Sequence, residues 1–125
     1  MSPQSGECSV PVLYGLRSCD TCRKARRFLD EYGVNHRFHD LREQGVDAAL
    51  VEHWLSQVGP DALLNRRSTT WRQLDDATRE RFAGPELQAW LAEYPTLIKR
   101  PVLQTPGGCL VGFDAATYRR ELLHE

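Results

Sequence analysis

The sequence predicts an α/β fold with a mixed four-stranded sheet, and three features of the residue pattern support this prediction. An apolar run at Val12–Leu16, a segment with helical spacing and an alternating segment follow one another, which is the order of a strand–helix–strand unit. Such units place their strands parallel with a right-handed crossover. Further on, Thr105-Pro-Gly-Gly joins two apolar segments, Thr96–Gln104 and Cys109–Gly112, and indicates an antiparallel hairpin. Asp114 then caps a last helix.

The first helix is expected from Asp20 onward. Its apolar residues fall on one face, at the spacing of a half-buried helix: Ala25, Phe28, Leu29 and Tyr32. Gly33 stands where a glycine ends many helices. Residues Val34–His39 alternate between apolar and polar positions and indicate the second strand.

Between the second strand and the hairpin the sequence predicts a block of helices. It follows a loop at Leu41–Gly45, and Asp47 caps its first helix, which Gly59-Pro60 ends. Shorter helices are expected over Asp61–Arg67 and Asp75–Phe82, and Pro85 takes the first position of another.

The order of these elements is β-α-β, helices, β-β, α, which is a thioredoxin-like arrangement with a helical insertion in the middle. The chain of 125 residues is expected to form a single domain. Its thioredoxin-like core is predicted over residues 11–46 and 95–125, the insertion over 47–94, and a loose tail over 1–10.

The composition and charge of the chain argue against a nucleic-acid-binding, membrane-spanning or secreted protein. Formal charges nearly cancel, with a net charge of −1, so the overall balance does not predict binding to nucleic acid or to an anionic membrane. No apolar run approaches the roughly 18–20 residues of a membrane span, and the N-terminal residues do not resemble a secretory signal. A cytoplasmic location is therefore expected, where thiols stay reduced and a C-x-x-C pair is catalytic, sensing or metal-binding.

The motif Cys19-Asp-Thr-Cys22 lies at the predicted junction of the first strand and the first helix. A helix start offers unpaired N–H groups and a partial positive charge, both of which stabilise a thiolate, the reactive form of cysteine. Arg17, Arg23 and Lys24 add positive charge nearby. Cys22, one turn along, is placed to attack a mixed disulfide on Cys19.

The cysteine motif has two alternative interpretations, a zinc site and a pair of inert core thiols. The spacing Cys19-x2-Cys22-x13-His36-x2-His39 lies near that of a C2H2 zinc finger, but the finger places its cysteines on a hairpin and its histidines on a helix. No metal site is predicted. Inert core thiols are disfavoured by the polar neighbours of both cysteines, whereas Cys109 is interpreted as a small core residue and Cys8 as an exposed bystander.

From Val12 to Leu123 the chain resembles the ArsC/Spx family of thioredoxin-like proteins, and most of all its YffB-type ArsC-like reductases. The family also includes glutaredoxin-coupled arsenate reductases and Spx-type regulators of RNA polymerase. The resemblance is carried by these segments, in the family's order: YGLRSCDTCRKARRFLDEYGV, FHDLREQG, ALLNRRSTTWRQLD, LIKRPVLQ and LVGF.

The resemblance implies roles for individual residues. Cys19 matches the nucleophilic cysteine, and Arg67 matches a mid-chain arginine, with Arg66 as the alternative match. Arg100 matches the arginine before a proline that is cis in the family, here Pro101. Arg17, Arg66 and Pro101 are expected to contact substrate, and Cys19, Cys22, Arg67 and Arg100 to carry the reaction.

Two departures from the family pattern matter. Arsenate-reducing members carry a further arginine after the hairpin, whereas this chain has no basic residue between Cys109 and Arg119, so arsenate is not expected as the main substrate. YffB-type proteins have one cysteine in the active loop, whereas this chain also has Cys22, as redox-sensing Spx proteins do.

Two functions are therefore expected as alternatives. The first is a thiol-disulfide oxidoreductase that uses glutathione, glutaredoxin or thioredoxin as co-substrate or partner. It is expected to be a monomer with no bound cofactor. The second is an Spx-type redox-sensing regulator that binds the C-terminal domain of the RNA polymerase α subunit. The basic residues that follow Cys22 are interpreted as a solvated helix face, with Asp30 and Glu31 as i+4 partners of Arg26 and Arg27.

Overall fold

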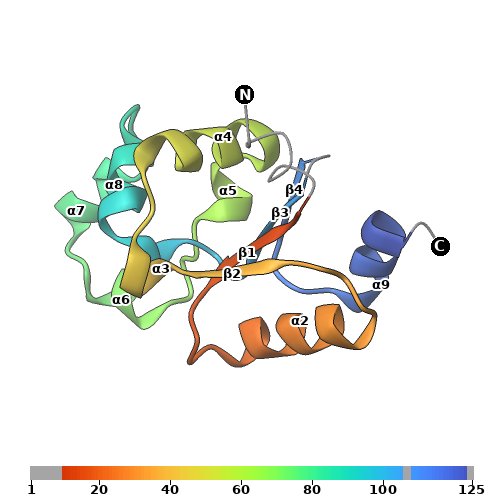
Figure 1. Ribbon diagram of the computed structural model, residues 1–125. Coiled ribbons are helices and arrows are strands. Elements are labelled where there is room, and N and C mark those ends of the chain that lie inside the picture. Colours follow the sequence, from red (N-terminus) through yellow and green to blue (C-terminus); the bar gives the residue numbers. More distant parts are fainter. Residues whose placement is uncertain (1–9, 106–107, 124–125) are drawn as a thin grey trace. The chain divides into compact units, whose positions relative to one another are not determined.

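The computed structural model describes residues 10–105 and 108–123. These residues form two compact units (Figure 1). The first holds the described residues up to Asp40 and from Arg100 onward, and the second is Leu41–Lys99. The second unit begins six residues before the predicted insertion of 47–94 and ends five residues after it. In the described part of the chain, no helix is long and apolar enough to cross a membrane.

Within these residues, four strands form one mixed sheet in the order β2-β1-β3-β4. The strands are β1 (Val12–Gly15), β2 (Arg37–Asp40), β3 (Val102–Thr105) and β4 (Gly108–Val111). β1 runs parallel to β2, and β3 is antiparallel to both β1 and β4. This topology confirms the predicted thioredoxin-like sheet. The turn of the predicted hairpin falls partly outside the described residues.

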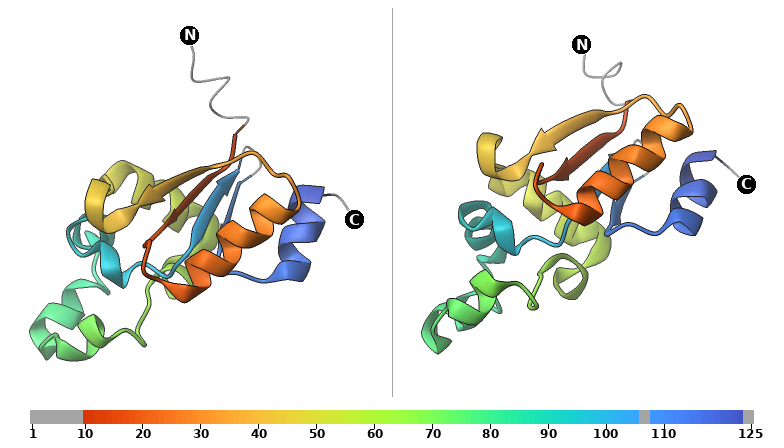
Figure 2. Two further views of the ribbon diagram at one scale, coloured as in Figure 1. Left: turned by 60° about the horizontal axis from the view of Figure 1, so that its bottom comes forward. Right: turned by 90° about the horizontal axis from the view of Figure 1, so that it is seen from below.

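Helices α2 (Asp20–Glu31) and α9 (Ala115–Tyr118, continued by a π-helical turn at Arg119–Leu123) pack on the same face of this sheet (Figure 2). Leu13 and Leu103 are register partners on β1 and β3 and contribute the sheet side of the core. Ala25, Phe28 and Leu29 of α2 and Tyr118 of α9 contribute the helical side. The burial of Ala25, Phe28 and Leu29 explains their helical spacing in the sequence, whereas Tyr32, which was predicted on the same face, is 45% exposed.

The termini of α2 and α9 follow the predicted signals. Gly33 follows α2 with φ of 66°, a left-handed conformation that glycine adopts without a steric penalty. Asp114 caps α9 by accepting a hydrogen bond from the Thr117 N–H, at 3.1 Å.

The second unit is helical. Its elements are α3 (Leu41–Gln44), α4 (Ala48–Val58), α5 (Pro60–Leu63), α6 (Thr69–Gln73), α7 (Asp76–Arg81), α8 (Leu87–Glu93) and a 3-10 turn (Pro95–Leu97). α4 packs against α8 and buries Trp54 completely. Two of the helix starts were predicted correctly, because Asp47 accepts a hydrogen bond from Leu50 N–H and Asp75 accepts one from Thr78 N–H, each at 2.8 Å.

Several predicted boundaries are wrong. Leu41–Gly45 is not a loop, because its first four residues form α3. The helix was not predicted, since four residues are too few to show a helical period. The helix α6, capped by Ser68, was not predicted. Pro85 does not start α8, since Glu86 is the N-cap and Leu87 the first helical residue. The strand expected over Thr96–Gln104 begins at Val102, after the 3-10 turn and the cis peptide at Arg100–Pro101.

Candidate functional site

Cys19 is the N-cap residue of α2, with extended backbone angles (φ −85°, ψ 125°). Its N–H donates to the Leu16 carbonyl oxygen at 3.1 Å, and its carbonyl oxygen accepts from the Arg23 N–H at 3.0 Å. A tight turn thus joins β1 to α2 and holds Cys19 at the helix start, where N–H groups have no partner within the helix.

The environment of the Cys19 sulfur favours the thiolate. Partial burial raises the pKa of Cys19, but this effect is outweighed by hydrogen bonds that the sulfur accepts from the N–H and the thiol of Cys22, from the Arg100 side chain and from the Thr21 N–H. The net result is a pKa below the ordinary value for a thiol. A lower pKa increases the nucleophilic fraction near neutral pH.

The pKa of Cys22 is shifted in the opposite direction. Its side chain is completely buried, and burial is the main cause that raises its pKa to about 12. The negative charge of a Cys19 thiolate raises it further, whereas the Leu16 N–H and the charge of Arg100 act in the other direction. The two thiols of one motif therefore differ strongly in acidity, and only Cys19 ionises readily.

Gly15 makes room for this arrangement. A Cβ atom at position 15 would overlap the sulfur of Cys22 and stand 3.3 Å from its Cβ. The last residue of β1 therefore has to be glycine for Cys22 to point beneath the strand end. Here glycine is needed for the close approach of a side chain.

Arg100 and Pro101 enter the site from the segment before β3. The Arg100 side chain hydrogen-bonds to the Cys19 sulfur, and the Arg100–Pro101 peptide is cis, as the resemblance implied. Pro101 is buried, and its carbonyl oxygen accepts from the Gly112 N–H at 2.8 Å. Cys19, Cys22 and Arg100 thus lie together, with Pro101 joined directly to them through the chain.

Arg66 and Arg67 belong to the second unit, and both are exposed. The Arg66 guanidinium pairs with Asp61 at 3.3 Å in a surface ion pair. The Arg67 N–H donates to the side chain of Asn65 at 3.1 Å. Their catalytic and substrate-binding roles stay predictions.

Asp40 is a residue of this site that the sequence analysis missed. It ends β2, it is 3% exposed, and its carboxylate accepts a hydrogen bond from the Arg17 N–H at 2.9 Å. It thereby fixes the loop that leads to Cys19. In the sequence, the only signal for Asp40 is an acidic residue directly after an alternating strand segment. In the structure, Asp40 is the register partner of Gly15 in the parallel pair β1–β2.

Cys109 was predicted as a core residue, and His36 was considered as a zinc ligand. Cys109 is half-buried on β4, and burial raises the pKa of its thiol. His36 lies just before β2, and its Nδ1 is 2.9 Å from the Val34 carbonyl oxygen. In residues 10–105 and 108–123, no three His, Cys, Asp or Glu side chains are grouped to hold a metal ion. Cys8 lies outside the described residues.

Comparison with known proteins connects this geometry to a family. The model of the ArsC family matches residues 14–120, a span that includes the cysteine motif, Asp40 and Arg100. The chain belongs to the ArsC family. This assignment confirms the resemblance read from the sequence.

The relatives of this ArsC-family chain include a solved structure, an uncharacterized protein and a transcriptional regulator. The solved YFFB (PA3664) protein is 40% identical, with a TM-score of 0.82 over 90% of this chain and 99% of its own. An uncharacterized protein of Haemophilus influenzae is 39% identical over 86% of this chain and 95% of its own length. The global transcriptional regulator Spx of Lactiplantibacillus plantarum is 25% identical over 89% and 85%, respectively.

Proposed function

We propose that the protein is a thiol-disulfide oxidoreductase in which Cys19 is the nucleophile and Cys22 the resolving thiol. The observation that carries the proposal is the difference in acidity within one C-x-x-C motif: the pKa of Cys19 is lowered at the start of α2, and that of Cys22 is raised by burial. A cysteine pair of this kind attacks in a fixed order, because the thiolate is the nucleophile.

In the first step, the Cys19 thiolate attacks one sulfur of a substrate disulfide. A new bond forms between that sulfur and Cys19, the substrate's S–S bond breaks, and the second sulfur leaves as a thiolate that takes up a proton from water. Arg100 hydrogen-bonds to Cys19 and holds its negative charge before the attack. The substrate is a disulfide-bonded protein or a mixed disulfide of glutathione with another thiol.

In the second step, Cys22 loses its proton and attacks the Cys19 sulfur. This releases the bound thiol as a thiolate and leaves a Cys19–Cys22 disulfide, which glutathione, glutaredoxin or thioredoxin reduces back to two thiols. The mixed disulfide removes the negative charge of Cys19, one of the causes that raise the pKa of Cys22. Formation of the intermediate therefore makes Cys22 a better nucleophile.

Other residues are assigned to binding. We propose that Arg67 and Arg100 each bind anionic groups of the substrate, such as a glutathione carboxylate, and that Arg17, Arg66 and Pro101 contact the substrate. Arginine suits this role because its guanidinium forms bidentate hydrogen bonds to carboxylates. The protein is proposed to act in the cytoplasm as a monomer without a bound cofactor.

Alkylation of Cys19 as a function of pH tests the proposed nucleophile. The Cys22→Ser variant leaves Cys19 as the reactive thiol of the motif, and its alkylation rate should rise with pH around a pKa below the free value of ~8.5. A midpoint at or above that value would remove the mechanism. Mass spectrometry of the same variant after mild oxidation then identifies the thiol attached to Cys19.

An Spx-type redox regulator is the second candidate, favoured by the Spx relatives and by the presence of Cys22 in the active loop. In this case, formation of the Cys19–Cys22 disulfide would alter binding to the C-terminal domain of the RNA polymerase α subunit. A pull-down with that domain, using reduced and oxidised protein, separates the two functions. The absence of binding in both states would exclude the regulator.

A further inference from the structure

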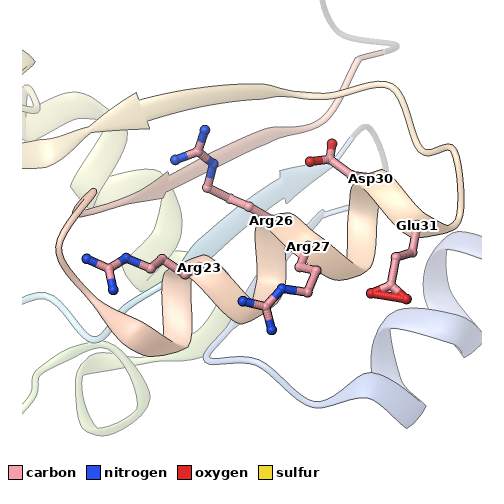
Figure 3. A pocket seen from close by; sticks show the side chains of 5 residues that line it. All are labelled: Arg23, Arg26, Arg27, Asp30 and Glu31. Carbon is pink, nitrogen blue, oxygen red and sulfur yellow. The ribbon is translucent and has the colours of Figure 1, made fainter.

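A cationic surface begins beside Cys19 and continues along α2. We call it the arginine face and define it by Arg17, Arg23, Arg26 and Arg27. Three of these arginines line a hollow of about 380 Å³ on α2, together with Asp30 and Glu31 (Figure 3). Arg26 and Asp30 point to one side of the helix, and Arg27 and Glu31 to the other.

Two of the guanidinium groups are held in place by the same aromatic ring. The Cζ atom of Arg26 lies 4.4 Å from the centroid of the Phe38 ring, and the Cζ atom of Arg17 lies 5.5 Å from it. Cation–π attraction favours such positions. Phe38 lies on β2, and its ring thereby contacts both the guanidinium of Arg17 in the cysteine loop and that of Arg26 in α2.

Arg23 connects the loop and the helix. Its Nε donates to the Arg17 carbonyl oxygen at 3.2 Å, and its Nη1 pairs with Asp20 at 3.3 Å. With Arg17 and Arg26 placed against Phe38, three of the four arginines of the face are oriented by contacts within the first unit. Arg23, Lys24 and Arg27 are exposed, as the prediction of a solvated helix face requires, and the contacts in addition orient Arg17, Arg23 and Arg26.

Positive charge predominates in residues 20–27 of α2. The arginines of the helix lie there, nearest Cys19, together with one acidic residue, Asp20, which pairs with Arg23, whereas Asp30 and Glu31 lie at the far end of the helix. From Cys19 to Arg27 the helix rises ~12 Å, at about 1.5 Å per residue. A ligand that reacts with Cys19 and also contacts Arg27 must therefore span this distance in an extended conformation. Its anionic groups must lie on the residues next to its disulfide.

We infer that the arginine face receives an acidic segment of a protein whose disulfide Cys19 attacks. This inference rests on the proposed oxidoreductase function and names its substrate class. A protein segment fits better than a nucleic acid because the face adjoins a thiol that reacts with disulfide sulfur, which nucleic acids lack. Complementary charge raises association rates, and salt reduces the effect.

The test uses two synthetic peptides that differ only in charge. Each carries one cysteine bonded through a disulfide to 5-thio-2-nitrobenzoate, and the cysteine is flanked by three Glu residues in one peptide and three Gln residues in the other. The Cys19 thiolate attacks the peptide sulfur, forming an enzyme–peptide disulfide, and the S–S bond breaks to release coloured thionitrobenzoate. The Cys22→Ser protein limits the reaction to this single step.

The measured quantity is the ratio of second-order rate constants, Glu peptide over Gln peptide. We expect a ratio of about tenfold at low salt that falls toward one in 0.5 M NaCl. Changes in the pKa of Cys19 affect both peptides equally and cancel in the ratio. A ratio near one at low salt would overturn the inference while the reaction with both peptides still supports the oxidoreductase; no reaction with either peptide would remove the proposed function itself.

Variants locate the effect. Arg23→Gln/Arg27→Gln, added to Cys22→Ser, should lower the ratio several-fold, and the rate with the Gln peptide shows that the variant is folded and reactive. Arg119→Gln/Arg120→Gln removes the same two charges from exposed side chains elsewhere in the first unit and should leave the ratio unchanged. An equal fall of the ratio in both variants would show that the preference depends on the net charge of the protein rather than on the arginine face, and would overturn the inference. A DNA oligonucleotide that competes as well as a cysteine-free Glu peptide would indicate a general polyanion site instead and overturn the inference.

Discussion

At the scale of single residues, Gly15 is the point where the backbone of β1 meets the sulfur of Cys22. Because a Cβ atom there would overlap that sulfur, Gly15→Ala should lower the free energy of unfolding by about 1–3 kcal/mol, the usual cost of overpacking a core. Urea denaturation measures the loss. In a Cys22→Ala background most of the overlap is gone, so the same substitution should cost less. Equal losses in the two backgrounds would contradict the proposed contact.

Asp40 allows a second prediction at this scale. Its buried carboxylate accepts the Arg17 N–H in a part-buried hydrogen bond, so Asp40→Ala removes a hydrogen bond to a charged group and should cost about 1.5–3 kcal/mol of unfolding free energy. Asp40→Asn retains an oxygen acceptor at the same place and should cost less. Urea denaturation compares the two variants, and a smaller loss for Ala than for Asn would show that the hydrogen bond to the cysteine loop is unimportant.

At the scale of elements, the helices of the second unit depend on their caps. Asp47 accepts the Leu50 N–H at the start of α4, so Asp47→Ala should lower the free energy of unfolding by about 1 kcal/mol. Asp61→Ala is the control, because its exposed ion pair with Arg66 should contribute less than about 1 kcal/mol. Loss of urea resistance in the control variant but not in Asp47→Ala would contradict the assignment of the cap.

The elements also show what the sequence allowed to be predicted. The strand–helix–strand unit, the hairpin and the caps Asp47 and Asp114 were predictable because each depends on local spacing or on a local hydrogen bond. The four-residue helix α3 and the short helix α6 were missed because so few residues carry no period. The start of β3 was misplaced because the apolar residues before it pack in a turn rather than in the sheet.

The candidate site was predictable to the extent that it is local. Cys19 and Cys22 were identified from their spacing at a helix start, and Arg100 from a family resemblance. Asp40 and Phe38 were not, because their roles arise from the parallel pairing of β2 with β1, which brings residues far apart in the sequence to one edge. Such contacts leave no periodic signal in a single chain.

At the scale of the whole molecule, the two thiols affect stability in opposite directions as the pH changes. The folded pKa of Cys19 lies below its unfolded value near 9.0, so ionisation of Cys19 adds stability that is fully present above the unfolded pKa and is lost as the pH falls through the folded pKa. The folded pKa of Cys22 is raised to about 12, so the stability that its neutral thiol contributes is present below pH 9 and is lost as the pH rises toward 12.

This difference predicts the behaviour of two variants. Relative to the wild type, Cys19→Ser should lose most stability near pH 9, where the thiolate contributes fully, and lose less at lower pH. Cys22→Ala should lose progressively less relative to the wild type as the pH rises above 9. Urea unfolding from pH 6 to pH 10.5 tests both trends, and parallel pH profiles for all three proteins would contradict them.

The chain leaves the first unit after Asp40 and returns to it at Arg100. Asp40 anchors the loop before Cys19, and Arg100 hydrogen-bonds to the Cys19 sulfur, so both crossing points are also supports of the reactive thiol. The helical unit is thus inserted between two residues that support the reactive thiol. A sequence change that displaced Asp40 or Arg100 would remove the anchor of the cysteine loop or the hydrogen bond to the Cys19 sulfur.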